Sequence, residues 1–473
     1  MDITLLGPEL ILAVFASLVI LADLFLPPKA GQFSLHLSLL GIALAAIISI
    51  SLIGRNTTSF FGMLVVDEFA IFFKLAFLLA AALVALSAGQ FLERHARVAS
   101  EFHGLLLFST AGMMLMAGTR ELISIYVSLE LASISLYLLA GLARGDQKSS
   151  EAAIKYLLLG ALSSAVLLYG MALLYGLSGT TDLANIASAL SMGPSPALLL
   201  AMALVAAGFG FKIAAVPFQM WAPDVYEGAP TPVTAFLSVA SKAAGFAVLI
   251  RVFTVAMPGL QADWTALFAV LAALTMTIGN VAAIPQQNIK RMLAYSSIGH
   301  AGYLLMGVAT ASILGLSSTL FYLLAYTVTN VAAFTVVIAA SRAAPGDQIA
   351  SYAGFHRKSP LLSFAMAASL LSLAGLPPMV GFFAKLYLFA AAFQAGLVWL
   401  VMLGLLNSAI SLYYYSQVVR QMYLVAPPDE QPVRLPTPAL VSLAAAMVGV
   451  FALGITSNPF LAFAQTAVSG MVR

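Results

Sequence analysis

Residues 208–221 read GFGFKIAAVPFQMW, in which Lys212 follows a long uncharged stretch and Pro217 comes five residues later. A proline inside a helix removes one backbone hydrogen bond and clashes with the preceding turn, which here carries Lys212 and Ile213. If this stretch is helical, we expect the helix to break or kink beside the lysine. What the lysine does there depends on its solvent, and the composition decides what that solvent is.

The composition is that of a membrane protein. Of the 473 residues, 62% are hydrophobic and only 8% are charged, against roughly 25% charged in soluble domains. The sequence has no cysteine and five histidines, which excludes disulfides and cysteine-ligated iron–sulfur clusters and leaves little for a metal or haem site. It also lacks a glycine-rich dinucleotide-binding fingerprint, and a scattered net charge of +3 does not indicate nucleic acid as a partner. We therefore expect no redox centre, cofactor or metal bound by this chain.

Apolar stretches of about 20 residues predict an all-α fold with about fourteen transmembrane helices. Their expected ranges are 8–26, 35–53, 68–91, 102–118, 121–142, 152–176, 196–222, 231–256, 264–285, 291–311, 314–341, 359–393, 397–423 and 436–458. The linkers are short, so residues 1–473 are expected to form a single polytopic membrane domain. The first span lacks the basic flank of a signal peptide, and we expect it to stay on the mature protein.

Lysines and arginines in the predicted loops set the expected orientation. With the N-terminus outside, the inner loops would hold Lys29, Arg94, Arg97, Arg144, Lys148, Lys290, Arg291, Arg342, Arg357, Lys358, Arg420 and Arg434. The outer side would hold only Arg55, Arg120, Arg251 and Arg473. Because basic residues accumulate in cytoplasmic loops, we expect both termini on the periplasmic side of a bacterial inner membrane.

Five lysines fall inside predicted spans, where a central charge costs at least about 2.5 to 3.5 kcal/mol on insertion scales. They are Lys74, Lys155, Lys212, Lys242 and Lys385. Lys74 and Lys155 lie near span ends and are expected to extend toward the lipid headgroups. Lys212 and Lys242 lie near mid-span, and Glu130 in YVSLELASISLYLLAG is the one acid predicted at a similar depth.

A carboxylate and two amines at one depth can be interpreted in two ways. One is a buried ion-pair network that only fixes helix packing, but replacing such a pair by apolar residues is often neutral or stabilising, so this role is weakly supported. The other is a proton relay. Burial generally lowers the pKa of an amine and a nearby carboxylate raises it again, so that a change in their distance loads or unloads a proton. We favour the relay.

The pattern of a lysine beside a broken helix occurs again downstream. Residues 372–393 read SLAGLPPMVGFFAKLYLFAAAF, with a predicted break at Pro377 and Pro378 followed by Lys385. If spans four to eight (101–256) and nine to thirteen (264–423) are five-helix repeats, the odd number inverts the second copy relative to the first. Three spans in 1–100 would precede the repeats, and a span and tail in 436–473 would follow. Broken helices in inverted repeats are typical of ion-translocating membrane proteins.

Several polar residues are secondary candidates. His300, in predicted span ten, titrates near neutrality and is therefore a natural link between Lys242 and Lys385. Tyr303 and Tyr326 are expected to help hold water near it.

Lys155 and two acids of the predicted inner loop after span seven are possible auxiliary residues. Asp224 and Glu227 either collect protons at an entrance or favour the start of the next helix through its dipole. The second reading is favoured.

Three stretches resemble a known family. They are PFQMWAPDVYEGAPTPVTAFLSVASKAAGF (217–246), QQNIKRMLAYSSIGHAGYLLMG (286–307) and GLPPMVGFFAKLYLF (375–389). They closely resemble the subunit N family of proton-pumping NADH:quinone oxidoreductase, complex I, and the resemblance covers the chain from end to end. The PDVYEGAPTP loop followed by an SK pair is specific to this family and its chloroplast-type relatives, whereas subunits L and M and the Mrp antiporters carry variants.

The resemblance implies roles for single residues. Glu130 matches the family's glutamate of span five, Lys212 its lysine of span seven, Lys242 that of span eight, and Lys385 the lysine of span twelve that faces the exit path. His300 matches a histidine of the corresponding stretch. Gln219 departs from the family, which commonly has histidine there. A glutamine cannot titrate, so it is expected to hold a water rather than to carry a proton.

The function that the resemblance implies is that of an antiporter-like, proton-translocating membrane subunit of complex I. It would couple NADH:quinone electron transfer in other subunits to pumping through a Glu/Lys/His relay. NADH, flavin, iron–sulfur clusters and quinone are expected in partner subunits, with neighbouring membrane subunits as direct partners. The alternatives are a subunit of an Mrp-type cation/proton antiporter and a purely structural membrane scaffold.

Overall fold

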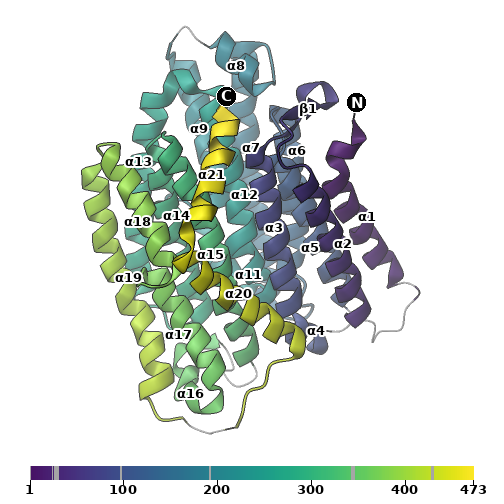
Figure 1. The fold of residues 1–473 in the computed structure, drawn as a ribbon, viewed down its shortest axis with the longest axis vertical. Helices are drawn as coiled ribbons and strands as arrows, with labels where there is room; N and C mark the ends of the chain where they lie inside the picture. The colour runs from purple at the N-terminus through teal and green to yellow at the C-terminus, as the bar shows by residue number, and fades with distance from the viewer. Residues whose placement is uncertain are drawn as a thin grey trace.

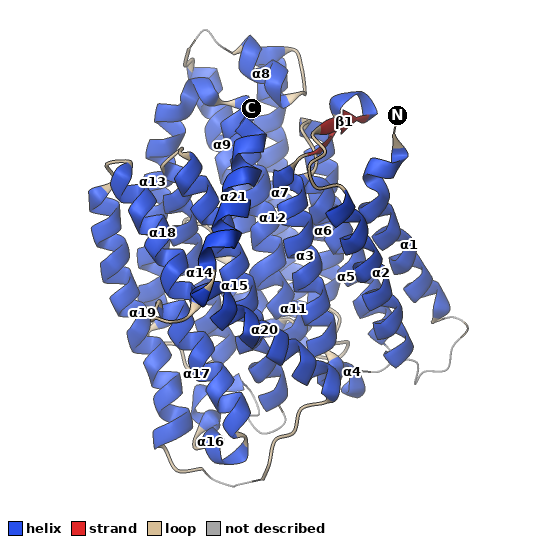
Figure 2. Ribbon diagram, viewed as in Figure 1, coloured by secondary structure: helices blue, strands red, loops and turns tan. Residues whose placement is uncertain are grey.

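The computed structural model describes residues 2–23, 25, 31–95, 98–190, 193–341, 347–427 and 431–472. These residues form a bundle of long helices packed side by side, with one short β-hairpin at its edge (Figures 1 and 2). The hairpin pairs β1 (Thr57–Ser59) with β2 (Leu64–Val66) in antiparallel register, Thr58 opposite Val65. The prediction of an all-α membrane protein is confirmed.

The first eight predicted spans all correspond to helices. They are α1 (Gly7–Ala22), α2 (Gly31–Ser51), α3 (Glu68–Ser87), α5 (Ala99–Ala117), α6 (Leu122–Ala140), α7 (Gln147–Ser178), the broken pair α9 (Pro196–Ile213) and α10 (Trp221–Gly228), and the run α11 (Thr231–Phe236), η4 (Leu237–Ser241) and α12 (Lys242–Ala256). The short elements η1 (Ile3–Leu6), η2 (Phe60–Gly62), α4 (Gly89–Arg94) and α8 (Leu183–Ala189) lie at their ends.

The last six predicted spans are helical as well. They are α13 (Gln261–Ala283), α14 (Ile289–Ala309), α15 (Ile313–Ala340), the broken pair α17 (Pro360–Ala374) and α18 (Val380–Gln394), α19 (Val398–Leu424) and α20 (Thr437–Ile455), with η5 (Pro258–Leu260), η7 (Ile349–Tyr352) and α16 (Phe355–Lys358) between them. The residues assigned to a C-terminal tail continue from α20 as the helix α21 (Ser457–Val472).

Eleven helical segments of the described chain are long and apolar enough to cross a membrane. Helices α5 and α14 are also long enough, with 19 and 21 residues, but carry more polar side chains. The α17–α18 pair crosses in two shorter pieces. Together these segments account for the fourteen predicted spans.

Local signals in the sequence set the ends of the helices that matter for the site. Ser195 caps α9 by accepting a hydrogen bond from the Leu198 backbone N–H, and Pro196 occupies the first turn, where its missing N–H costs nothing. Helix α7 ends at Ser178, and the next residue, Gly179, has a left-handed φ of 72°, a conformation open to glycine at no steric cost. These two signals delimit the connection through α8.

The two broken helices run in opposite directions. Helix α8 and the start of α9 lie at the end of the bundle that carries both chain termini, whereas α16 and the start of α17 lie at the opposite end (Figure 1). Helix α9 therefore runs away from the terminus-bearing face and α17 runs toward it. The second set of five spans is thus inverted relative to the first, as predicted.

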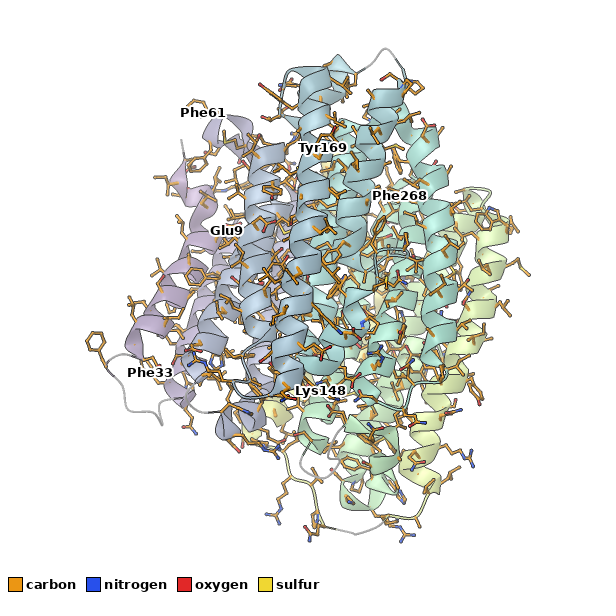
Figure 3. The ribbon with its side chains drawn as sticks, turned by 180° about the vertical axis from the view of Figure 1, so that it is seen from behind. Glu9, Phe33, Phe61, Lys148, Tyr169 and Phe268 are labelled. Carbon is orange, nitrogen blue, oxygen red and sulfur yellow. The ribbon has the colours of Figure 1, made fainter. Side chains whose placement is uncertain are left out.

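Both termini lie on one face, which we call the terminus-bearing face, and Lys148 lies at the opposite face (Figures 1 and 3). The prediction that both ends share one side is therefore consistent with the fold. Four of the basic residues that entered the orientation argument, Lys29, Arg97, Arg342 and Arg473, lie outside the described residues.

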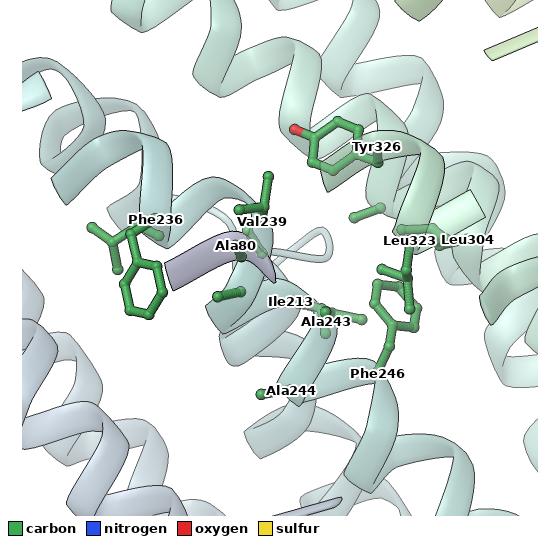
Figure 4. Close-up of a cluster of buried hydrophobic side chains, with 14 of the residues drawn as sticks. Ala80, Ile213, Phe236, Val239, Ala243, Ala244, Phe246, Leu304, Leu323 and Tyr326 are labelled. Atoms are coloured by element: carbon green, nitrogen blue, oxygen red, sulfur yellow. The ribbon is translucent and has the colours of Figure 1, made fainter. Parts of the chain in front are cut away.

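The centre of the bundle is the run α11–η4–α12, whose membrane-spanning residues are all buried. In α15, 94% of the membrane-spanning residues are buried, and in α3 78%. Figure 4 shows how these elements pack, with Ala80 of α3, Val239 of η4, Ala243 of α12 and Leu323 of α15 in one apolar cluster. In α7 only 28% of the membrane-spanning residues are buried, so this helix lies at the periphery. The lysine that begins α12, Lys242, is therefore held in the middle of the protein.

The structure corrects two readings of single charges. Lys74 does not extend to the headgroups, because α3 is packed on several sides. Its side chain is fully buried, with Nζ 2.7 Å from Oε1 of the buried Glu9. Arg251, counted among the outer residues, is also buried and pairs with Asp67 at 2.8 Å.

Candidate proton-transfer site

The first helix break places Lys212 in the last turn of α9. The helix ends at Ile213, and Ala214 takes a left-handed φ of 58°. A neighbouring helix supplies a hydrogen-bond partner to the backbone at the break: the Val216 N–H donates to Thr275 Oγ1 of α13 at 3.0 Å. Lys212 is 5% exposed and donates from Nζ to Ser133 Oγ of α6 at 2.9 Å. The predicted break beside a buried lysine is present, with Pro217 inside it.

Glu130 lies on α6, one turn before Ser133, and is only partly buried. Its Oε1 accepts a hydrogen bond from Ser164 of α7. Among the described residues it forms no ion pair with Lys212. Ser133 and Ser164 instead line one small cavity together with Lys212. The amine and the carboxylate that the sequence places at a similar depth thus each contact a serine that lines this cavity.

Lys242 follows a π-helical turn, η4, which shifts the register of the helix directly before the lysine; such turns are frequent at functional sites. Its Nζ donates to both the backbone oxygen and Oγ of Ser297 in α14. The preceding turn is held from α15, where Asn330 donates to Ser238 Oγ at 2.6 Å. One turn beyond Lys242, Gly245 packs against the stem of Lys212, where a Cβ would lie 3.3 Å from Cγ. The two lysines therefore occupy neighbouring, tightly packed helices.

His300 is buried in α14 with both ring nitrogens hydrogen-bonded. Nδ1 lies 2.6 Å from the hydroxyl of Tyr322 in α15, and Nε2 lies 3.2 Å from that of Tyr415 in α19. The Tyr415 hydroxyl also contacts Ser296 Oγ. Because neutral imidazole has one donor and one acceptor nitrogen, each hydroxyl completes one of these two roles.

The second break places Lys385 beside the end of α17. That helix ends at Ala374, Gly375 follows with φ 94°, and α18 begins at Val380 after Pro377 and Pro378. Lys385 Nζ donates to the Ala374 carbonyl at 2.9 Å and to Ser408 Oγ of α19 at 2.8 Å. The predicted break is confirmed, and it supplies the carbonyl that binds the lysine.

Two tyrosines fill the spaces on either side of His300. The Tyr326 ring lies 5.8 Å from Lys242 Nζ and 5.1 Å from the His300 ring. The Tyr303 ring lies 5.9 Å from the His300 ring and 4.8 Å from Lys385 Nζ. Lys242, His300 and Lys385 thus form one continuous buried row, with a tyrosine in each interval.

The auxiliary candidates Lys155, Asp224 and Glu227 lie apart from this row, at the face opposite the termini. Asp224 pairs with Lys155 at 2.8 Å and with Arg291 at 2.7 Å. Glu227 pairs with Lys148 at 2.9 Å. Burial raises the pKa of the Asp224 carboxyl, but hydrogen bonds from Lys155 and Arg291 outweigh this and hold that pKa below its usual range. The predicted loop acids are therefore members of an ion-pair cluster that joins α7, α10 and α14.

Gln219 lies in the first break, between α9 and α10, and its Oε1 is buried without a hydrogen-bond partner in the described residues. Among those residues, no three His, Asp or Glu side chains lie together as a metal site. The groups that sequence reasoning missed are mostly hydroxyls: Ser133, Ser164, Ser297, Tyr322, Ser408 and Tyr415. Serine and tyrosine are common in membrane helices, and only the one-turn spacing from Glu130 could have pointed to Ser133.

Comparison with known proteins gives consistent results. Residues 119–411 match the family model described as NADH:quinone oxidoreductase/Mrp antiporter, TM. The NADH-quinone oxidoreductase subunit N of Trichlorobacter lovleyi is 47% identical over 472 residues, which is 99% of this chain and 97% of that protein. A chain of respiratory complex I from Thermus thermophilus with bound aureothin superposes with a TM-score of 0.81 at 38% identity, covering 96% of this chain and 98% of that one. A chain of the Mrp complex from Dietzia sp. superposes with a TM-score of 0.84 at 23% identity, covering 98% and 97%, and at that identity it shows the shared fold alone.

Proposed function

Because the chain belongs to the NADH:quinone oxidoreductase/Mrp antiporter family, we propose that it moves protons across the membrane as the antiporter-like subunit N of complex I. The proposed carriers are Glu130, Lys212, Lys242, His300 and Lys385. The observation that carries this assignment is the buried row in which Lys242, His300 and Lys385 are separated only by Tyr326 and Tyr303.

Along this row a proton moves from a protonated donor to an acceptor that has none. A lysine that is buried without a carboxylate partner releases its proton more readily than one in water, since desolvation disfavours the charged form. Lys212 receives a proton through the cavity that it shares with Ser133 and Ser164. Lys212 hands the proton to Lys242, Lys242 passes it to His300, and His300 passes it to Lys385 at the second break. Each transfer moves one proton and leaves the donor neutral, ready to be loaded again.

The broken helices supply the flexibility and the polar backbone that such transfer requires. In a membrane, non-helical backbone is tolerated only where it is buried in protein or lines a hydrated cavity. The Ala374 carbonyl, freed at the end of α17, accepts the Lys385 hydrogen bond. A small shift at this break would change the partner of the lysine and hence its charge state.

The identity of the relatives favours complex I over an independent antiporter, because the 47% identical relative is a subunit N whereas the Mrp likeness extends to the fold only. NADH, flavin, iron–sulfur clusters and quinone would then be bound by partner subunits, and neighbouring membrane subunits would cover the exposed apolar faces. With the positive-inside bias, the terminus-bearing face would be periplasmic in a bacterial inner membrane.

Two substitutions of Lys212 separate a relay from a scaffold. Lys212→Met keeps an apolar stem and removes the titrating group, so the complex should assemble while proton pumping falls. Lys212→Arg should impair pumping as well, because arginine stays protonated at a pKa above about 12 and cannot release its proton. Native gels, NADH:quinone electron transfer and pumping in sealed vesicles would be measured for both. Normal assembly with full pumping in either variant would contradict the proposal.

A further inference from the structure

Glu9 and Lys74 form an ion pair that the proposed relay does not use. Glu9 lies in the first turn of α1 and Lys74 in the second turn of α3, and their side chains are 4% and 0% exposed. The Nζ–Oε1 distance is 2.7 Å. Glu9 lies in the half of the bundle nearer the terminus-bearing face (Figure 3). An acid and a base are therefore buried together on α1 and α3, which carry none of the proposed relay residues.

The pair has no supporting hydrogen bonds among the described residues. Lys74 Nζ and both oxygens of Glu9 lack any hydrogen-bond partner there, apart from the ion-pair contact itself. Burying two charges is offset only when further hydrogen bonds satisfy the remaining lone pairs and protons, and a pair without them does not favour stability. Buried unsatisfied polar atoms in native proteins call for an explanation. Glu9 Oε2 is such an atom, a carboxylate oxygen with a free position for a proton.

Apolar layers separate the pair from its surroundings on two sides. Toward the terminus-bearing face, one turn before Glu9 and Lys74, a satellite cluster is formed by Leu5, Leu52, Leu64, Val66 and Ile71. Toward the lysine row, α3 contacts the central helices through residues such as Ala80, which lies in the apolar cluster with Val239 and Ala243 (Figure 4). The nearer face is thus one apolar layer away, and no polar chain among the described residues joins the pair to Lys242.

Other charged groups near these helices are already engaged or lie elsewhere. Asp67 is held by Arg251. Asp2 accepts from Thr4. Glu68 Oε2, at the start of α3, is also buried without a hydrogen-bond partner among the described residues, but it lies against α21, 3.0 Å from the position that a Cβ on Gly470 would take. Arg55 and Arg120 follow α2 and α5 at the terminus-bearing face, while Glu101, His103 and Asp23 lie at the far ends of α5 and α1. Lys74 is therefore the one charge in contact with Glu9 in the described chain.

We propose that Glu9 and Lys74 form a second proton-binding site, filled from the terminus-bearing face and separate from the relay of lysines. Glu9 Oε2 takes one proton from water when the satellite cluster opens. The carboxylate becomes a carboxylic acid, Lys74 remains an ammonium, and the net charge of the site rises by one. In the low dielectric of the bundle, this added charge acts on the lysine row through space, because Coulomb interactions there are weakly screened.

Infrared difference spectroscopy of the assembled complex in liposomes tests the site directly. A step in external pH should produce the carbonyl stretch of a protonated carboxyl group. The signal should be absent in Glu9→Gln, which keeps a side chain of the same length beside Lys74, and should remain in Glu130→Gln. In Lys74→Gln the carbonyl band should remain but shift in frequency, because the charged neighbour of the Glu9 carboxyl group is gone.

The outcomes separate this proposal from the relay. An identical spectrum in Glu9→Gln and the parent, or a signal lost only in Glu130→Gln, would overturn the second site without touching the pumping tests on Lys212. If Glu9→Gln fails to assemble, Lys74→Gln decides the question, since an unchanged carbonyl band in that variant means a static pair. If the double variant Glu9→Gln/Lys74→Gln restores assembly and still shows the carboxyl signal of the parent, the pair likewise serves packing alone.

Discussion

Lys212 donates its hydrogen bond to Ser133, 2.9 Å away, and not to Glu130, which lies one turn earlier on the same helix. The distinction matters for proton transfer. A direct carboxylate partner favours the protonated lysine, whereas a serine hydroxyl can both accept and donate and favours neither state strongly. Ser133 in turn donates to the Leu129 carbonyl at 2.6 Å. The lysine is therefore held in place without being locked in its charged form.

Ser133→Ala should lower proton pumping about tenfold, because it leaves the Lys212 ammonium without its hydrogen-bond acceptor. Loss of one hydrogen bond to a buried charged group costs roughly 1.5 to 3 kcal/mol, and each 1.4 kcal/mol or so on a barrier is a factor of about ten in rate. Ser135→Ala is the matched control, since Ser135 lies on the same helix and its hydroxyl donates to the Leu131 carbonyl of that helix. Equal pumping in the two variants, per electron transferred, would show that Ser133 does not serve Lys212.

Tyr415→Phe should interrupt transfer at His300. It removes the hydroxyl that contacts Nε2 of His300 and Oγ of Ser296 while keeping the ring. Tyr413→Phe is the control, because Tyr413 is on the same helix and 57% exposed. We expect pumping to fall by roughly tenfold in the first variant and to stay unchanged in the second, with both complexes assembled on native gels. A Tyr415→Phe complex that pumps normally would remove this hydroxyl from the pathway.

Gly375→Ala tests the contact between the second break and Lys385. An added Cβ would lie 2.9 Å from Lys385 Cδ, and the φ of 94° at this position is itself unfavourable for alanine. Gly396→Ala has the same backbone penalty at φ 79° but meets no atom within 4 Å. Both variants should lose about 1 to 2 kcal/mol through the left-handed conformation. Only Gly375→Ala should also reduce pumping, measured against electron transfer in sealed vesicles, and equal pumping in both would contradict the argument.

The sequence predicted those parts of the site that carry a strong local signal. A lysine inside an apolar span is rare and expensive, and a proline within five residues of it predicts a break. Lys212 and the pair Pro377 and Pro378 could therefore be placed on broken helices, and the inversion followed from the count of spans. Lys242 was recognised by its depth and by the family resemblance, and its π-helical turn has no distinctive residue pattern.

The partners of the charges could not be predicted in the same way. Ser133, Ser297 and Ser408 are ordinary residues of membrane helices, and each reaches a lysine only because its helix packs against the helix that carries the lysine. Lys74 was misplaced because its position near a span end suggested an extended side chain. The packing of α3 inside the bundle closes that route, and its partner Glu9 comes from a helix more than 50 residues away in the chain. Such pairings depend on tertiary structure and leave no local trace.

Asp224→Asn should weaken the attachment of α10 to α7 and α14 in a pH-dependent way. The two ion pairs of Asp224 are partly exposed, so the loss at neutral pH should be about 1 kcal/mol and smaller at high salt. The pKa of Asp224 is lowered in the folded protein, so its contribution is fully present above the unfolded value of about 3.9 and is lost as the pH falls through the lower folded value. Heat-induced dissociation of this subunit from the purified complex should therefore differ between parent and variant at pH near 7. The difference should disappear only at strongly acidic pH. A double-mutant cycle with Lys155→Gln isolates the Lys155 contact, and a stability difference that persists unchanged below the folded pKa of Asp224 would show that the carboxyl acts through something other than its charge.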